Sequence, residues 1–260
     1  FLRKVTDLVA LGLGFPAIHS DETGMKILLH KGVPLDDAWN WNPCGCVETN
    51  LAGMMRTYTD YAHVNMGSAL EFALTNGIQR VTGLRMGTAT GNPQHWQTYG
   101  EFSEAVKVQL AFLIRKAIKM NQILESLVAE MRPVPVISLS FRDCITRARD
   151  YECGGPRYSL GNGISLLGVA DIVNSLAAVR KLIYEEKLIT WDMLLEALRN
   201  DFTGYEELRT RCLAAQKYGY EIDEVDEKQV RLFAADEIDR ERGHERIARG
   251  HVVKPDVLDA

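Results

Sequence analysis

The stretch that decides the fold is Trp41-Asn42-Pro43-Cys44-Gly45-Cys46-Val47-Glu48-Thr49-Asn50. It places the thiol of Cys46 two residues before the carboxyl group of Glu48. A thiol can lose a hydrogen atom to become a radical, or lose a proton to become a nucleophile. A neighbouring carboxyl group can move the protons that either chemistry needs. Cys46 and Glu48 are therefore the candidate catalytic residues, in a segment with turn residues at both ends.

The rest of the chain has the composition of an ordinary globular protein, with 46% hydrophobic and 25% charged residues among 260. Acidic side chains outnumber basic ones by 35 to 30, and the net charge of -5 argues against nucleic acid as a partner. No run of about 18 uncharged apolar residues occurs, so we expect no membrane span. The chain begins Phe1-Leu2-Arg3-Lys4, without Met or a signal peptide, so we expect an internal piece of a longer protein.

The five cysteines do not suggest a disulfide scaffold, because their number is odd and the chain is long. A reducing cytoplasm fits this content better. Cys44 and Cys46 form a C-x-C pair, which could begin a metal site. Such a site needs further ligands, and Cys144, Cys153 and the six histidines show no clustered spacing. We therefore expect no bound metal.

Apolar spacing and turn residues predict a helix-rich chain. Helices are expected over residues 22–31, 35–38, 65–76, 101–131, 168–186, 191–200, 205–215 and 223–249. Thr190 is a suitable N-cap for one of them. Residues 5–13 predict a strand or a buried helix, the alternation at 136–141 predicts a buried strand, and glycines predict loops at 83–93 and 151–163. Helices alternating with a few strands and long glycine loops favour an α/β fold over a helical bundle.

Three blocks of sequence extend the pattern around Cys46. They are Gly32-Val33-Pro34-Leu35-Asp36-Asp37-Ala38 running into Gly45-Cys46-Val47-Glu48, then Asn65-Met66-Gly67-Ser68-Ala69-Leu70-Glu71, and finally 161–179 with Asp201-Phe202-Thr203-Gly204-Tyr205-Glu206. Together they resemble the glycyl radical enzymes, a family of pyruvate formate-lyase-like and diol-dehydratase-like proteins. The resemblance implies that residues 1–225 form part of a ten-stranded α/β barrel with the Cys loop inside it. Residues 226–260 depart from the family and are expected to form a charged helical tail.

The resemblance also implies a glycyl radical, installed by a separate radical S-adenosylmethionine activating enzyme. In the family, the radical-bearing glycine lies near the C-terminus in an Arg-Val-x-Gly-Tyr/Phe segment. Residues 80–84 are similar, but they lie close to Cys46 and have no aromatic residue after Gly83, so we interpret Gly83 as a loop glycine. The chain is thus expected to carry the thiyl half of the site, with the glycyl segment absent from it.

The residues after Glu48 favour one branch of the family. Many of its dehydratases and C–N lyases have Pro where this chain has Thr49. The string 42–50, together with 58–62 and 65–68, is more similar to the arylacetate decarboxylases.

In such an enzyme, the resemblance implies that a Cys46 thiyl radical oxidises the arylacetate carboxylate, CO2 leaves, and a methylarene forms. Glu48 manages the accompanying proton, since a glutamate shielded from water can hold a proton near neutral pH. Decarboxylases of 4-hydroxyphenylacetate have a His near the position of Gln79. Gln79 is therefore the substrate-binding candidate, and it leaves indoleacetate or phenylacetate open.

Two alternatives stay open. One is a dehydratase or C–N lyase for a diol, hydroxyproline or amino alcohol, in which Cys46 abstracts a substrate hydrogen and Glu48 deprotonates the adjacent hydroxyl. The other is a non-catalytic fragment or remnant without a glycyl segment. Besides the activating enzyme, the resemblance implies a homodimer and, in some decarboxylases, a small iron–sulfur subunit. The expected location is the cytoplasm of an anaerobic bacterium.

Overall fold

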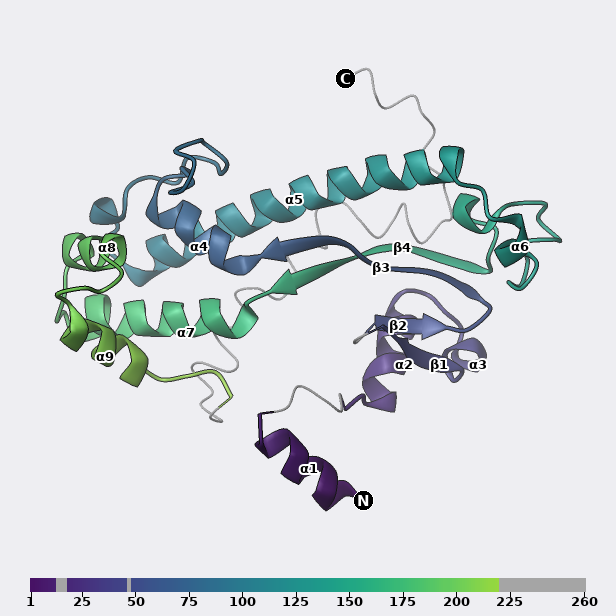
Figure 1. Cartoon of the computed structure of the whole chain (residues 1–260), viewed down its shortest axis with the longest axis horizontal. Coiled ribbons are helices and arrows are strands. Elements are labelled where there is room, and N and C mark those ends of the chain that lie inside the picture. The colour runs from purple at the N-terminus through teal and green to yellow at the C-terminus, as the bar shows by residue number, and fades with distance from the viewer. Residues whose placement is uncertain (13–17, 46–47, 220–260) are drawn as a thin grey trace. The chain divides into compact units, whose positions relative to one another are not determined.

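The structure is a computed structural model that describes residues 1–12, 18–45 and 48–219 (Figure 1). Its helices are α1 (Leu2–Ala10), α2 (Asp21–His30), α3 (Leu35–Ala38), α4 (Met66–Leu74), α5 (Tyr99–Met131), α6 (Pro135–Ser138), α7 (Val169–Val179), α8 (Trp191–Arg199) and α9 (Glu206–Ala214). Short turns of 3-10 helix lie at η1 (Pro93–His95) and η2 (Tyr151–Cys153), and a π-helical turn, η3, at Arg180–Glu185. Strand β1 (Trp41–Cys44) pairs with β2 (Glu48–Leu51), and β3 (Met55–Asn65) pairs with β4 (Tyr158–Leu167). The described part is thus helix-rich with two small sheets, and the ten-stranded barrel remains a prediction.

The described chain divides into two compact units. Unit 1 contains the described residues of 1–61 and 121–163, and unit 2 contains 62–120 and 164–219. The candidate residue Glu48 belongs to unit 1 and the candidate residue Gln79 to unit 2. The predicted tail 226–260 lies outside the described residues.

Unit 1 is built around helix α2 and the β1–β2 hairpin. Ser20 caps α2 by accepting a hydrogen bond from the Thr23 amide at 3.4 Å, and acidic residues occupy the first turn. A Cβ added at Gly24 would lie 2.5 Å from the Trp41 ring, so glycine lets the helix approach the hairpin closely. The core beneath consists of apolar residues that are at least nine-tenths buried: Leu28, Val33, Ala38, Leu51, Met54 and Met55.

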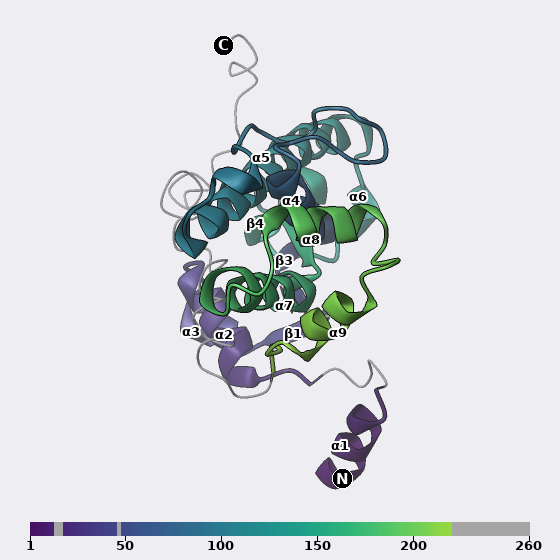
Figure 2. The same cartoon turned by 90° about the vertical axis from the view of Figure 1, so that its left-hand side faces the viewer.

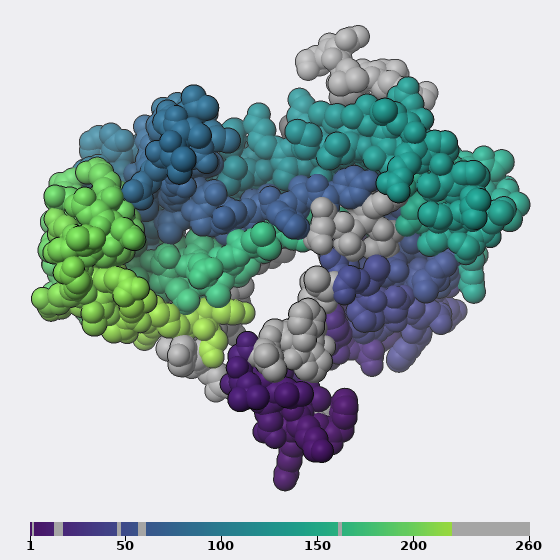
Figure 3. Space-filling model, viewed as in Figure 1, coloured from purple at the N-terminus to yellow at the C-terminus, as the bar shows by residue number. Residues whose placement is uncertain are grey.

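Unit 2 is a helical assembly around an aromatic cluster. The rings of Trp96, Phe102 and Trp191 contact one another edge to face or tilted, with centroids 5.1–5.6 Å apart. Helices α4, α7 and α8 and the first half of α5 supply most of the remaining core residues (Figure 2). In the space-filling view, the green segment that carries α8 and α9 forms one continuous surface (Figure 3).

Several predicted helices are confirmed, including residues 35–38 and the helix that Thr190 caps through the Met193 amide at 3.3 Å. The helix predicted over 168–186 changes at Arg180 from α7 to the π-helical turn η3. Residues 5–10 are helical, within α1, but this helix is not the buried one expected, because Leu8 and Val9 are 43% and 44% exposed. The helix predicted over 223–249 lies outside the described residues.

Two predictions were wrong. Residues 136–141 are not a strand: Pro135 starts the helical turn α6, and the Ser138 side chain bonds back to the Val134 carbonyl at 3.0 Å. Val136 is 79% exposed, so the alternating pattern marks no buried face. The loop predicted at 151–163 contains the 3-10 turn η2 and the first half of β4. Strand pairing with β3 outweighs the low strand propensity of the glycines in β4.

None of the helices in the described part of the chain is both long and apolar enough to cross a bilayer.

Candidate functional site

The Cys hairpin, residues 41–51, carries the predicted site. Its strands are antiparallel, with Cα partners Trp41↔Leu51, Asn42↔Asn50, Pro43↔Thr49 and Cys44↔Glu48. Residues 45–47 connect the strands, and Gly45 has a φ of 62°, in the left-handed region that favours glycine. Cys46 belongs to this connection but lies outside the described residues, so its predicted role stays a prediction.

The two faces of the hairpin differ in chemistry. Side chains alternate along a strand, and directly paired residues share a face. Trp41 and Leu51 therefore lie on one face, where they pack with the core of unit 1. Cys44 and Glu48 lie together on the other face, and both are half-buried. The hairpin is thus anchored through the face that carries Trp41 and Leu51, and Cys44 and Glu48 lie on the opposite face.

The Glu48 carboxyl group folds back over Gly45. A Cβ built at Gly45 would lie 2.6 Å from the Oε2 atom of Glu48 and 3.2 Å from its Cδ atom. A side chain at position 45 would therefore both strain the backbone and push the carboxyl group away. Glycine at this position leaves room for the Glu48 carboxyl group beside Gly45, the residue that precedes Cys46 in the chain.

The apolar face of the hairpin borders a cavity of about 230 Å³ in unit 1. Its lining includes His19, Thr23, Trp41 and Thr49. The Trp41 indole nitrogen donates to Asp21 at 3.0 Å, which fixes the ring at the cavity wall. Because paired residues alternate between faces, the cavity lies on the face opposite to Glu48.

Both ends of the hairpin are tied to other parts of unit 1. At its exit, the Gly53 carbonyl accepts from the Arg142 amide at 2.8 Å, and the Met54 carbonyl accepts from the Tyr158 amide at 3.0 Å. At its entry, the Tyr158 hydroxyl donates to Oδ2 of Asp37 in α3 at 2.5 Å. This hydrogen bond, helped by the Arg157 guanidinium, holds the pKa of Asp37 below its usual value.

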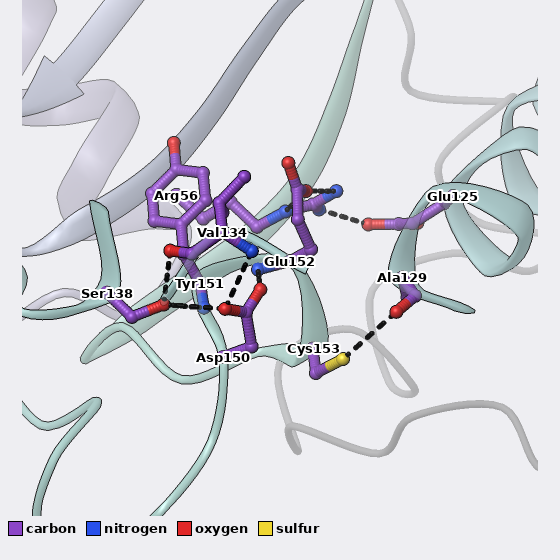
Figure 4. Close-up of polar contacts among 9 residues, drawn as sticks. All are labelled: Arg56, Glu125, Ala129, Val134, Ser138, Asp150, Tyr151, Glu152 and Cys153. Carbon is purple, nitrogen blue, oxygen red and sulfur yellow. Dashed lines mark hydrogen bonds and ion pairs between the residues drawn. The ribbon is translucent and has the colours of Figure 1, made fainter. Parts of the chain in front are cut away.

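A buried ion pair holds the start of β3, just after the hairpin (Figure 4). The Nε and Nη2 atoms of Arg56 each donate to Oε2 of Glu152 at 3.2 Å, and Nη1 donates to Glu125. The side chains of Arg56 and Glu152 are each 2% exposed. No sequence pattern predicts this network, because Arg56 lies 69 and 96 residues before its two partners and no local motif joins them.

The turn that contains η2 is held by side-chain and backbone hydrogen bonds (Figure 4). The Asp150 carboxylate accepts from the Val134 amide at 2.9 Å, the Ser138 hydroxyl at 2.8 Å and the Glu152 amide at 3.0 Å. Ser138 also accepts from the Tyr151 amide at 2.8 Å. These contacts orient Glu152, the partner of Arg56.

Gln79 lies in a tight turn of unit 2 and makes its contacts within that turn. Its Oε1 atom accepts from the Thr82 hydroxyl at 2.7 Å, and its carbonyl accepts from the Gly83 amide at 2.9 Å. The following residues are held by the buried Gln109, whose amide group bonds both the carbonyl and the amide of Thr88, at 2.7 and 3.1 Å. Gln79 belongs to unit 2 and Glu48 to unit 1, and the role of Gln79 in binding substrate stays a prediction.

Metal ligands are not gathered in the described part: no three His, Cys, Asp or Glu side chains there form a group that could hold an ion. Cys44 is a free thiol within that part. Its C-x-C partner, Cys46, lies outside it.

Comparison with known proteins gives matches along the whole chain. A family model described as pyruvate formate lyase-like matches residues 1–258. Trans-4-hydroxy-L-proline dehydratase from Clostridioides difficile is 33% identical over 236 residues, which cover 90% of this chain and 30% of that protein. A crystal structure of that organism's hydroxyproline dehydratase with trans-4-hydroxy-L-proline bound matches with a TM-score of 0.83 and 32% identity, over 90% of this chain and 30% of that one.

Two further matches are to a protein with a different named activity and to a protein from a different organism. Indoleacetate decarboxylase from Tractidigestivibacter scatoligenes is 25% identical over 277 residues, covering 95% of this chain and 31% of that protein. The crystal structure of a glycyl radical enzyme from Archaeoglobus fulgidus matches with a TM-score of 0.76 and 30% identity, over 86% of this chain and 28% of that one. The chain thus spans about 30% of the length of these proteins.

Proposed function

The chain belongs to the pyruvate formate-lyase-like family of glycyl radical enzymes, and we propose that it carries the thiyl half of a lyase active site. In this proposal Cys46 carries the hydrogen atom and Glu48 transfers the proton. The matches to the family model and to its relatives confirm the family that the three sequence blocks resemble. The observation that supports the roles best is the Glu48 carboxyl group folded over Gly45, next to the connection that contains Cys46.

A glycyl radical on a segment outside the present chain would supply the one-electron oxidation that converts the Cys46 thiol into a thiyl radical. The residues present fit this chemistry, because the Glu48 carboxyl group lies beside Gly45, which precedes Cys46 in the chain. The hairpin is also anchored at both ends. We further propose that the complete protein encloses the Cys hairpin in a ten-stranded barrel. Such enclosure would keep water and oxygen from the thiyl radical.

The reaction we favour is elimination from a hydroxylated substrate. The Cys46 sulfur takes a hydrogen atom from a substrate carbon, leaving a carbon radical. The hydroxyl group on the neighbouring carbon leaves as water, with Glu48 managing the protons. The product radical then recovers a hydrogen atom from Cys46, which restores the thiyl radical. Identity of 33% to a hydroxyproline dehydratase, against 25% to a decarboxylase, supports this order of preference.

Arylacetate decarboxylation is the second candidate, favoured by Thr49-Asn50 after Glu48. Here the Cys46 thiyl radical takes one electron from the substrate carboxylate, CO2 leaves, and the sulfur gains a proton through Glu48. The arylmethyl radical then takes the hydrogen atom of the thiol, so that the net change is carboxylate plus proton to methylarene plus CO2. In this alternative Gln79 is the proposed contact for the aryl ring.

One experiment distinguishes the two reactions. The complete enzyme, activated without oxygen by its radical S-adenosylmethionine partner, is incubated with trans-4-hydroxyproline, glycerol and 1,2-propanediol, and separately with indoleacetate, phenylacetate and 4-hydroxyphenylacetate. Dehydration products from the first set support the elimination, and CO2 with a methylarene from the second supports decarboxylation. Turnover of neither set, with the glycyl radical visible by electron paramagnetic resonance, would contradict both.

The role of Cys46 has its own control. Cys46→Ser is expected to abolish turnover while the glycyl radical still forms, because serine cannot carry the hydrogen atom. Cys212→Ser, which changes a thiol in α9 of unit 2, is the matched control and should keep its activity. Retained turnover in Cys46→Ser would refute the thiyl role.

A further inference from the structure

The Cys hairpin is too short to hold its own geometry. Each strand has four residues, and an isolated two-stranded hairpin is at best marginally stable in water. The position of Glu48 therefore depends on the packing of Trp41 and Leu51 against unit 1 and on what holds the two ends of the hairpin. Helix α3 ends three residues before Trp41, and the turn Gly53-Met54 follows Leu51.

A single residue, Tyr158, holds both ends. Its backbone amide donates to the Met54 carbonyl at 3.0 Å, on the exit side of the hairpin. Its hydroxyl donates to the Asp37 carboxylate at 2.5 Å, on the entry side. The same residue thus fixes the distance between α3 and the turn after β2.

We call the hydrogen bonds of Tyr158 to Asp37 and to Met54 the clamp. Two neighbouring arginines support it. Arg157 approaches Asp37 at 3.5 Å and is itself held by Asp143 through two hydrogen bonds of 3.1 and 3.3 Å. The Arg157 amide donates to the Arg142 carbonyl at 3.1 Å, and the Arg142 amide donates to the Gly53 carbonyl at 2.8 Å. The Asp37 side chain is only 20% exposed, so its charged hydrogen bonds are partly shielded from water.

We propose that Tyr158 and Asp37 are positioning residues for the reaction, because their hydrogen bond fixes the Cys hairpin and with it the place of the Glu48 carboxyl group. This inference rests on the proposed function of Glu48. Neither residue is proposed to touch substrate. Their effect is geometric, and small displacements of reacting groups can lower rates by about a hundredfold.

The test uses the complete, activated enzyme and the substrate that it turns over. Tyr158→Phe removes only the hydroxyl, and Asp37→Asn removes only the charge. Each is expected to lower kcat about tenfold while KM changes less than about twofold and the glycyl radical content stays at the wild-type level. The double variant should be little worse than Tyr158→Phe alone, because both changes act on the same hydrogen bond: Tyr158→Phe removes it, and Asp37→Asn leaves only a neutral, weaker acceptor.

Each variant has a control with the same chemical change at an exposed position. Asp36→Asn changes the adjacent, exposed residue of α3, and Tyr218→Phe changes an exposed tyrosine of unit 2. Both should keep the wild-type kcat. If Tyr158→Phe and Asp37→Asn also keep it, or lower only the melting temperature, the positioning role is wrong.

A second measurement separates this inference from the proposed function. Hydrogen exchange of the amides in residues 41–51, followed by mass spectrometry well below the melting temperature, should be about tenfold faster in Tyr158→Phe and Asp37→Asn than in the two controls. Faster exchange with no turnover in the wild type would contradict the proposed function and leave the clamp supported. Unchanged exchange would overturn the clamp even if the wild type is active.

Discussion

Gly45 is constrained twice, by its own backbone and by the side chain of Glu48. A φ of 62° costs a residue with a Cβ atom about 1 kcal/mol, and the added Cβ would stand 2.6 Å from Oε2 of Glu48. The carboxyl group is the end of a flexible side chain, so it would move instead of the backbone. The sequence pattern shows a glycine in a turn, but only the coordinates show that the turn places it under the carboxyl group.

We therefore predict that Gly45→Ala lowers kcat strongly, whereas its effect on the melting temperature is no larger than that of Gly32→Ala. Displacing a general acid–base group removes part of a contribution of about a hundredfold or more, so a loss of at least about tenfold in kcat is expected. Gly32→Ala is the control, because Gly32 has a φ of 81° and nothing within 4 Å of its added Cβ. Steady-state kinetics of the two variants, with melting temperatures, measure the difference. Equal losses in both would mean that backbone strain alone is responsible.

Arg56 gives a stability prediction at the same scale. Arg56→Ala would leave the Glu152 carboxylate, 2% exposed, without its main partner. Breaking a buried pair in this way is expected to lower the free energy of unfolding by about 3–5 kcal/mol. Arg211→Ala, which breaks an ion pair whose side chains are 48% and 81% exposed, should cost no more than about 0.5 kcal/mol. Urea denaturation measures both, and similar costs would show that burial of the Arg56 pair has little effect.

Elements with local signals were predictable, and elements that depend on distant partners were not. Helix α8 begins where Thr190 caps it, and α2 ends just before Gly32, because capping and turn residues act within a few positions. The sequence does not predict strand β3 and predicts a loop over the first part of β4, because the pairing of these strands joins segments almost one hundred residues apart. The Cys hairpin is predicted as a loop for a different reason: its strands have only four residues each and carry little periodicity.

The capping interaction of α8 can be tested directly. Thr190→Ala removes the hydroxyl that accepts from the Met193 amide at 3.3 Å, and it should lower the free energy of unfolding by about 1 kcal/mol. Thr190→Ser keeps the acceptor and should restore most of this loss. Thermal or urea unfolding of the two variants gives the comparison, and an equal loss in both would assign the effect to the methyl group of Thr190.

At the scale of the whole molecule, the two units share one response to alkaline pH. Burial raises the pKa of Tyr158 in unit 1 to about 12, with the Asp37 hydrogen bond adding to it, and burial raises the pKa of Tyr99 in unit 2 to about 12. Their values in the unfolded chain are near 10. Stability from these tyrosines is therefore fully present below about pH 10 and is lost as pH rises toward about 12.

The opposite sign holds for the carboxyl groups. The hydrogen bond from Tyr158 lowers the pKa of Asp37, and the hydrogen bond from Arg157 lowers that of Asp143. Because these pKa values are lower in the folded state, the stability that they give is present above about pH 4 and is lost as pH falls through the lowered values. The free energy of unfolding should thus have a plateau between the acid and alkaline losses.

The variants that test the clamp also test this plateau. Tyr158→Phe should lower stability at about pH 7 but reduce the further loss between about pH 9 and 11.5, leaving the part due to Tyr99. Asp37→Asn should instead reduce the loss on acidification, and Asp36→Asn should leave it unchanged. Urea midpoints at several pH values measure these slopes.

Since the clamp fixes the Cys hairpin, we expect the amides of residues 41–51 to lose less exchange protection between about pH 9 and 11.5 in Tyr158→Phe than in the wild type, each compared with its own value at about pH 7. An equal loss in the two proteins would show that the clamp does not set the local stability of the hairpin.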